Sequence, residues 1–219
     1  MHRRIPLLWS FAPYIVMSAI HVIALAAHSD LAGPTKLWLM PLLTIPVLLR
    51  LKLRPTAAIA LLLAAALLSW LGDGAGAFFP AGPELPLMLA FFGLAHVAYI
   101  VLFARYLGIR RLPWWTLIYA LWWVAMLVAL GPHTGPLLIA VAVYGLLLGS
   151  TAAAAARCHP LVVTGAVFFL ASDTILSFRL FLPDALPDWT SPAVMLTYTL
   201  GQGLLVAGAL VSLRGRKSR

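Results

Sequence analysis

Long apolar runs separated by short polar stretches dominate this chain. Breaks at charge clusters and at Pro/Gly pairs leave eight apolar segments: residues 7–27, 34–49, 56–72, 86–105, 113–130, 135–156, 160–181 and 191–213. A helix of about 17 residues or more can span a hydrocarbon core of ~30 Å. The pattern therefore predicts an all-α polytopic membrane bundle of about eight transmembrane helices. No polar stretch is long enough for a soluble domain, so residues 1–219 are expected to form a single integral membrane domain.

Two of the segments have alternative interpretations. Segment 34–49 is short and contains Pro41 and Pro46, which predicts a kinked or partly re-entrant helix. Segment 7–27 follows Arg3-Arg4 and contains Ala24-Leu-Ala26, features that a cleaved signal peptide also has. Its apolar run is long for a signal peptide and continues the regular alternation of the loops, so a membrane helix is the preferred interpretation.

Composition supports an embedded chain. Hydrophobic residues make up 63% of the sequence and charged residues 10%, whereas a soluble domain has about 25% charged residues. The net charge of +9 does not indicate nucleic-acid binding, because the basic residues form short clusters between apolar runs, as in cytoplasmic loops. The single cysteine, Cys158, excludes an intramolecular disulfide and a cysteine-based metal cage.

The basic clusters also predict an orientation. If the N-terminus is cytoplasmic, 13 of the 15 basic residues lie on the cytoplasmic side and all six acidic residues lie on the outer half. The positive-inside rule therefore predicts that both termini are cytoplasmic, and we expect the protein in a bacterial inner membrane. The cytoplasmic set is Arg3, Arg4, Arg50, Lys52, Arg54, Arg105, Arg110, Arg111, Arg157, Arg214, Arg216, Lys217 and Arg219.

The two basic residues left on the outer half are Lys36 and Arg179, and two aspartates share that half with them. Asp73 ends segment 56–72. Asp173 lies 13 residues into segment 160–181, so at ~1.5 Å per residue it is roughly 20 Å from the inner end. An ionisable side chain inside a membrane costs at least ~2.5–3.5 kcal/mol, which makes it a candidate for function.

Other polar side chains converge on the same level of the bundle. His96 and Tyr99 share one helical face through their i, i+3 spacing, and Tyr198 and Gln202 share another through i, i+4. Without a recognised metal-binding spacing such as HxxxH or HExxH, a buried histidine is more often a hydrogen-bonding residue than a ligand, so no metal site is expected.

The two aspartates suggest acid–base chemistry. Two carboxyl groups in unlike environments can divide the roles of proton donor and proton acceptor. Alternatively, Asp173 pairs with Arg179 or caps a broken helix, and Asp73 is an interfacial loop residue. Spacing alone leaves these interpretations open.

Five motifs in order resemble those of the YhhN family of membrane proteins, which includes the animal lysoplasmalogenases. They cover roughly residues 34–212 and are Thr35-Lys36; Ser69-x-x-Gly72-Asp73; Phe92-Gly93-x-Ala95-His96-x-x-Tyr99-x-x-x-Phe103; Gly165-Ala166-x-x-Phe169-x-x-Ser172-Asp173-x-x-Leu176-x-x-x-x-Phe181; and Tyr198-x-x-x-Gln202. Two departures from the family pattern, the small residues at 74–77 and Leu37-Trp38 after Lys36, predict an altered pocket shape.

The resemblance implies a membrane hydrolase that cleaves the vinyl ether bond of lysoplasmalogen or a related ether lipid, giving a fatty aldehyde and a glycerophospho-alcohol. It implies Asp73 and Asp173 as the catalytic pair, and no cofactor. We expect Lys36 and Arg179 to contact the lipid phosphate, and His96, Tyr99, Tyr198 and Gln202 to orient the substrate, water or the carboxylates.

Two rival functions remain at this point. Intramembrane acids also serve as proton relays, so a proton-coupled transporter of small molecules or lipids is the main alternative. Inverted repeats and paired broken helices would favour a transporter, and the sequence has no such repeat. The second rival is a structural or lipid-binding membrane protein. The oligomeric state is not predicted.

Overall fold

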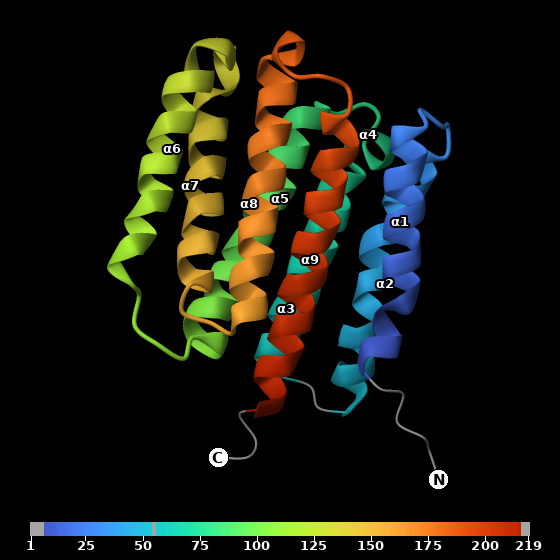
Figure 1. Cartoon of the computed structure of the whole chain (residues 1–219), viewed down its shortest axis with the longest axis vertical. Helices are drawn as coiled ribbons and strands as arrows, with labels where there is room; N and C mark the ends of the chain where they lie inside the picture. Colours follow the sequence, from blue (N-terminus) through green and yellow to red (C-terminus); the bar gives the residue numbers. More distant parts are fainter. Residues whose placement is uncertain (1–6, 54–55, 216–219) are drawn as a thin grey trace.

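A computed structural model describes residues 7–53 and 56–215. Over these ranges the chain forms eight long helices and the short helix α4 (Figure 1). Part of the predicted cytoplasmic charge set lies outside the described residues: Arg3, Arg4, Arg54, Arg216, Lys217 and Arg219. The helices are α1 (Ala12–Ala26), α2 (Ala32–Leu53), α3 (Ala57–Asp73), α4 (Ala75–Phe78), α5 (Glu84–Val101), α6 (Leu117–Leu130), α7 (Leu138–Ala155), α8 (Pro160–Phe181) and α9 (Thr190–Gly215).

Short helical turns extend several of these helices. A π-helix continues α5 over Leu102–Leu107, and the remaining turns are 3-10 helices at Leu7–Phe11, Trp114–Thr116, Gly131–His133, Gly135–Leu137 and Pro183–Ala185. With these turns, seven of the described helices are long and apolar enough to cross a membrane. The eighth, α3, is an apolar helix of 17 residues that packs along α2 and α5. The predicted all-α polytopic bundle is therefore confirmed.

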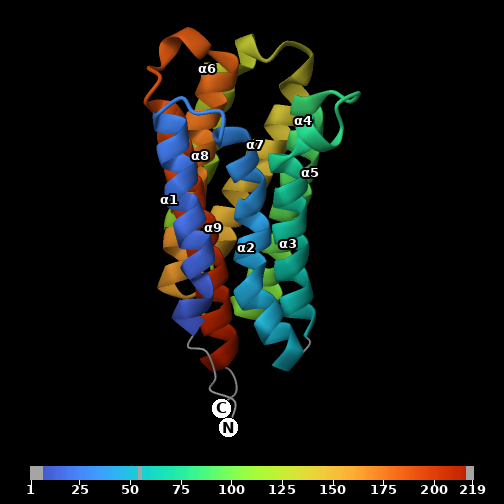
Figure 2. The ribbon, with the colours of Figure 1, turned by 90° about the vertical axis from the view of Figure 1, so that its right-hand side faces the viewer.

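Seven of the long helices form a closed ring. Each contacts the next in the order α1, α2, α3, α5, α7, α8 and α9, and α9 returns to α1. Helix α6 lies outside this ring, against α7 (Figure 1). Figure 2 shows the same order from the side, with α1 beside α9 and α2 beside α3. The ring places residues from distant parts of the sequence around one interior.

Helix α2 is continuous through both of its prolines, so the re-entrant alternative is wrong. Pro41 has no N–H, which leaves the carbonyl of Leu37, four residues earlier, without that helical donor. The indole Nε1 of Trp70 on α3 donates to this carbonyl at 2.9 Å. The proline therefore creates an acceptor that ties α2 to α3 beside Lys36 and Asp73.

Helices α8 and α9 approach each other through glycine. A Cβ placed on Gly201 would lie 2.8 Å from the backbone nitrogen of Phe169, and one on Gly165 would lie 2.7 Å from that of Leu205. Small residues let membrane helices pack backbone to backbone. This contact fixes the position of Asp173 on α8 relative to Tyr198 and Gln202 on α9.

The two ends of the bundle differ in charge. Helices α1, α3, α6 and α8 begin, and α2, α5, α7 and α9 end, at the same end of the bundle (Figure 1). Most of the described basic residues lie at or near this end, whereas Asp30, Asp73, Glu84, Asp184 and Asp188 lie at the opposite end. We call the acidic end the outer end, following the predicted orientation.

Candidate active site

A cavity of about 110 Å³ lies inside the ring toward the outer end. Six helices line it: α2, α3, α5, α7, α8 and α9. Most of the lining is apolar, including Met88, Leu89, Phe92, Leu176 and Met195, and the polar lining residues are Lys36, Asp73, Tyr144, Ser172, Asp173, Ser177 and Tyr198. Two carboxyl groups therefore share one small, mainly apolar space.

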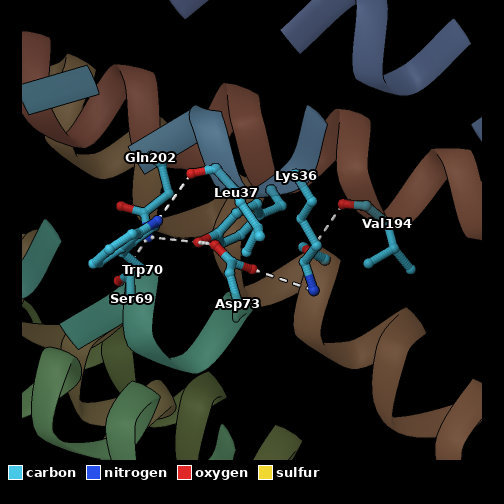
Figure 3. Close-up of polar contacts among 9 residues, drawn as sticks. Lys36, Leu37, Ser69, Trp70, Asp73, Val194 and Gln202 are labelled. Atoms are coloured by element: carbon cyan, nitrogen blue, oxygen red, sulfur yellow. Dashed lines mark hydrogen bonds and ion pairs between the residues drawn. The ribbon is translucent and has the colours of Figure 1, made fainter. Parts of the chain in front are cut away.

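Asp73, the last residue of α3, is surrounded by hydrogen donors. Its side chain is 4% exposed, and its Oδ1 lies 3.5 Å from the Nζ of Lys36 (Figure 3). Its other oxygen, Oδ2, accepts a 2.6 Å hydrogen bond from the hydroxyl of Tyr198. Both partners are donors, and an ionised carboxylate, which only accepts, can pair with both of them.

Gln202 fixes the direction of the hydrogen bond from Tyr198. Its Oε1 accepts from Tyr99 at 2.6 Å, and its Nε2 donates to Ser69 at 3.0 Å and to the Tyr198 oxygen at 3.5 Å. Because the Tyr198 oxygen already accepts, its single proton points to Asp73. Ser69, Tyr99 and Gln202 are all fully buried, so this network is rigidly held behind the cavity.

Asp173, midway along α8, has a different setting. The hydroxyl of Tyr144 on α7 hydrogen-bonds to its Oδ2, and its side chain is buried. Arg179, one and a half turns further along α8, donates instead to the Thr190 hydroxyl at 2.5 Å and to the Pro187 carbonyl at 3.4 Å. The alternative of an Asp173–Arg179 pair is therefore wrong.

The network behind Tyr144 determines a histidine tautomer. The Thr151 hydroxyl donates its only proton to the Leu147 carbonyl at 2.9 Å, so it must accept from Nδ1–H of His96 at 3.1 Å. Nε2 of His96 is then unprotonated and lies 3.5 Å from the Tyr144 oxygen. The Tyr144 proton thus has two acceptors within reach, Asp173 and His96.

Aromatic rings connect the two sides of the cavity. Phe169 contacts Tyr198 at a centroid distance of 5.5 Å and His96 at 4.9 Å, and Phe92 packs edge-on against both Phe169 and Tyr198. These ring contacts pack the Tyr198 side of the cavity against the His96 side.

The model of the YhhN family matches residues 31–209, from the start of α2 to near the end of α9. The chain belongs to the YhhN family. No curated protein and no solved structure matches it. Every residue that lines the cavity falls inside the matched range, so the candidate active site lies within the part of this YhhN protein that defines its family.

The structure brings most of the predicted site residues of this YhhN protein together. Asp73, Asp173, Lys36 and Tyr198 line the cavity. Three more predicted residues lie behind it: His96 lies within hydrogen-bond distance of Tyr144 and Gln202 of Tyr198, both lining residues. Tyr99 in turn donates to Gln202. Arg179 lies outside the lining, bound to the α8–α9 connection. Neither Leu37-Trp38 nor residues 74–77, the departures from the family pattern, line the cavity.

Sequence reasoning missed Tyr144, Thr151, Ser69 and the tether from Trp70. Tyr144 lies mid-way through an apolar segment, and a hydroxyl at that depth is a signal that could have marked it as a partner for an acid. Thr151 carries no such signal, because small hydroxyl residues are common at helix contacts, and Ser69 was part of a family motif but was given no role. Among the residues of this YhhN protein that the structure describes, no three His, Cys, Asp or Glu side chains gather to hold a metal ion.

Proposed function

We propose that this protein is a membrane-embedded hydrolase that cleaves the vinyl ether bond of a lysoplasmalogen-like ether lipid. The products are a fatty aldehyde and a glycerophospho-alcohol. One observation carries the proposal: Asp73 and Asp173 line the same apolar cavity, and each accepts from a tyrosine, but only Asp73 also lies beside a lysine ammonium. Unlike environments for two carboxyl groups support a division into acid and base.

Asp173 is assigned as the acid. When it carries a proton, it donates to the Tyr144 oxygen, and the Tyr144 proton turns toward the free Nε2 of His96. Each donor in this series of hydrogen bonds, from Asp173 through Tyr144 to His96, then has an acceptor. Asp73 is assigned as the ionised partner, because Lys36 and Tyr198 only donate to it.

The reaction begins with proton transfer from Asp173 to the vinyl carbon that is β to the ether oxygen. The positive charge that forms on the oxygen-bearing carbon is stabilised by the Asp73 carboxylate. Asp73 then takes a proton from water as the water oxygen bonds to that carbon, which gives a hemiacetal. The hemiacetal C–O bond to glycerol breaks, the glycerol oxygen takes the proton from Asp73, and the hemiacetal hydroxyl returns a proton to Asp173.

Lys36 is the cation placed to contact the lipid phosphate. Its side chain is 34% exposed, whereas Asp73 beside it is buried, so the ammonium group borders both the cavity and its outer surroundings. An ammonium has three donors and can bind a phosphate oxygen while it stays near Asp73. Before Arg179 could contact the phosphate, it would have to break its hydrogen bonds to Thr190 and Pro187.

The test is aldehyde release by purified protein from a 1-alkenyl lysophospholipid. Asp173→Asn and Asp73→Asn should each lower kcat by about 10²–10⁴-fold, the usual contribution of an acid–base group. Asp184→Asn, in the exposed α8–α9 connection, is the matched control and should keep wild-type activity. Folding of each variant is checked by its elution profile and thermal transition in detergent. Wild-type activity in both site variants would refute the acid–base pair.

A proton-coupled transporter predicts a different result in the same preparation. Proteoliposomes would then take up substrate without releasing aldehyde, and Asp173→Asn would abolish uptake. Aldehyde release that depends on both aspartates is incompatible with simple transport.

A further inference from the structure

The cavity between the aspartates is too small for a whole lipid. Its volume is about 110 Å³, whereas pockets for drug-sized ligands have roughly 300–1,000 Å³. It can hold the reacting end of a substrate and a water molecule. The hydrocarbon chain must therefore lie in another part of the protein or in the membrane beside it.

A larger apolar groove of about 680 Å³ runs between α5 and α7. On α5 its lining residues recur at helical spacing from Pro86 to Val97, and on α7 with the 3-10 turn before it they do so from Pro136 to Leu147. Each of these two rows of lining residues advances 11 residues along the chain, or about 16 Å at ~1.5 Å per residue. This is close to half of a ~30 Å hydrocarbon core, the depth of one leaflet.

The groove opens toward the membrane and begins at the outer end. Ile139 is 78% exposed and Leu94 53% exposed, although both are large apolar residues of membrane-spanning helices. The two rows that contain them begin near the starts of α5 and α7, at the same end of the bundle as Asp73 (Figure 1). The hydrocarbon chain of a lipid in the outer leaflet would lie parallel to this groove.

The groove adjoins the cavity. Leu89 and Tyr144 line both spaces, and Tyr144 is the residue that contacts Asp173. A second groove of about 360 Å³, between α2 and α3, shares no lining residue with the cavity. A third space, between α6, α7 and α8, does adjoin the cavity but measures only about 30 Å³. The α8–α9 seam is closed by glycine contacts between backbones.

We propose that the α5–α7 groove binds the single hydrocarbon chain of the substrate lipid and admits its ether end to the cavity past Leu89 and Tyr144. The inference rests on the proposed function for the identity of the reacting end. The ligand class is a single-chain lipid from the outer leaflet. The headgroup then lies toward Lys36, and the vinyl ether carbon lies between the aspartates.

The first experiment fills the groove. Ala90 and Ala140 line it, are exposed to the membrane and tolerate a larger side chain without entering the bundle core. Ala90→Trp and Ala140→Trp should raise KM for a long-chain alkenyl lysophospholipid about tenfold, because buried methylene contacts are lost, and leave kcat nearly unchanged. A short-chain analogue, which does not fill the groove, should show the same KM in variants and wild type. Ala125→Trp on α6 is exposed, lies outside both linings, and is the matched control.

The second experiment needs no turnover. An alkenyl lysophospholipid with a diazirine on its last chain carbon is photolysed with wild-type protein in nanodiscs, and labelled peptides are identified by mass spectrometry. The groove predicts labels on residues 86–97 and 136–147, with loss of label in Ala140→Trp. Labels on α2–α3 or spread evenly, together with unchanged long-chain KM in both Trp variants, would overturn the groove. Groove labels without any aldehyde release would instead refute the proposed function and leave the groove standing.

Discussion

Asp73 and Asp173 each accept a hydrogen bond from a tyrosine, but the two tyrosine protons differ in their freedom. Tyr198 is held by Gln202, so its proton has one destination, Asp73. Tyr144 faces an unprotonated nitrogen of His96, so its proton can point to Asp173 or away from it. The same residue pair, aspartate and tyrosine, therefore forms a locked site on α3 and α9 and a reversible site on α7 and α8.

This difference shows how two identical side chains can take different roles in one apolar cavity. In the locked site all neighbours of the carboxyl group are donors, which favours the ionised form that we propose for Asp73. The reversible site accommodates either protonation state without leaving a buried polar group unpaired, and an unpaired group would cost about 1–3 kcal/mol. A group that must give up and recover a proton in each cycle needs that second kind of setting.

After the loss of either carboxyl group, the largest expected effect comes from moving the two sites relative to each other. Gly201→Ala places a Cβ 2.8 Å from the Phe169 backbone nitrogen, so α8 and α9 must separate. We expect a loss of about 1–3 kcal/mol in stability from overpacking. Activity should fall about 10²-fold, because small misplacements of reacting groups have effects of that size. Thermal unfolding in detergent and the aldehyde assay measure the two losses.

The control for that substitution is Gly131→Ala, whose new Cβ would make only an ordinary contact, 3.5 Å from a Leu138 methyl group. It should leave both stability and activity near wild type. Equal behaviour of the two variants would mean that close packing of α8 on α9 does not set the site geometry.

Removing one hydroxyl at a time compares the two sites directly. Hydrogen bonds to charged groups contribute about 1.5–3 kcal/mol and those between neutral groups about 0.5–1.5 kcal/mol. Tyr198→Phe, at the ionised Asp73, should therefore lower kcat/KM by about 10–100-fold, and Tyr144→Phe, at the neutral Asp173, by about 2–10-fold. Each phenylalanine keeps the ring contacts with Phe169 or His96.

The reverse order of these two losses would reverse the assignment of acid and base. Double variants with the matching Asp→Asn change provide the control, because each tyrosine should lose its effect once its own aspartate is neutralised. A tyrosine effect that persists in the double variant would indicate packing rather than the hydrogen bond.

The sequence predicted the acids better than their partners. Asp73 and Asp173 were recognisable because a carboxylate in an apolar segment is costly wherever the helix packs. Tyr144 was not recognised, and Tyr198 was recognised without its partner, because it is 125 residues from Asp73 and only helix packing brings them together. Lys36 and Arg179 looked equivalent as outer cations, but Arg179 is drawn to the α8–α9 connection by Thr190. Pro41 and Pro46 suggested a kinked or partly re-entrant helix, whereas the helix continues and Trp70 donates to the Leu37 carbonyl that Pro41 leaves free.

The smallest expected effect tests whether the histidine tautomer matters. Thr151→Val keeps the shape of the side chain but removes the acceptor for Nδ1–H of His96. The ring proton is then free to move to Nε2, which would donate toward Tyr144 and hold the Tyr144 proton on Asp173. Asp173 would stay ionised more of the time and lose its role as acid, so kcat should fall about 2–10-fold with KM unchanged.

Nitrogen NMR of histidine-labelled protein checks the tautomer itself, with His96→Gln to assign the signal. Thr44→Val is the matched control, because its hydroxyl likewise bonds a carbonyl of its own helix but contacts no histidine. If Thr151→Val shifted the tautomer and kept wild-type kcat, the Tyr144 proton would not need His96 as its second acceptor. The reversible site would then consist of Asp173 and Tyr144 alone, and the distinction between the two aspartates would rest on Lys36 and Gln202.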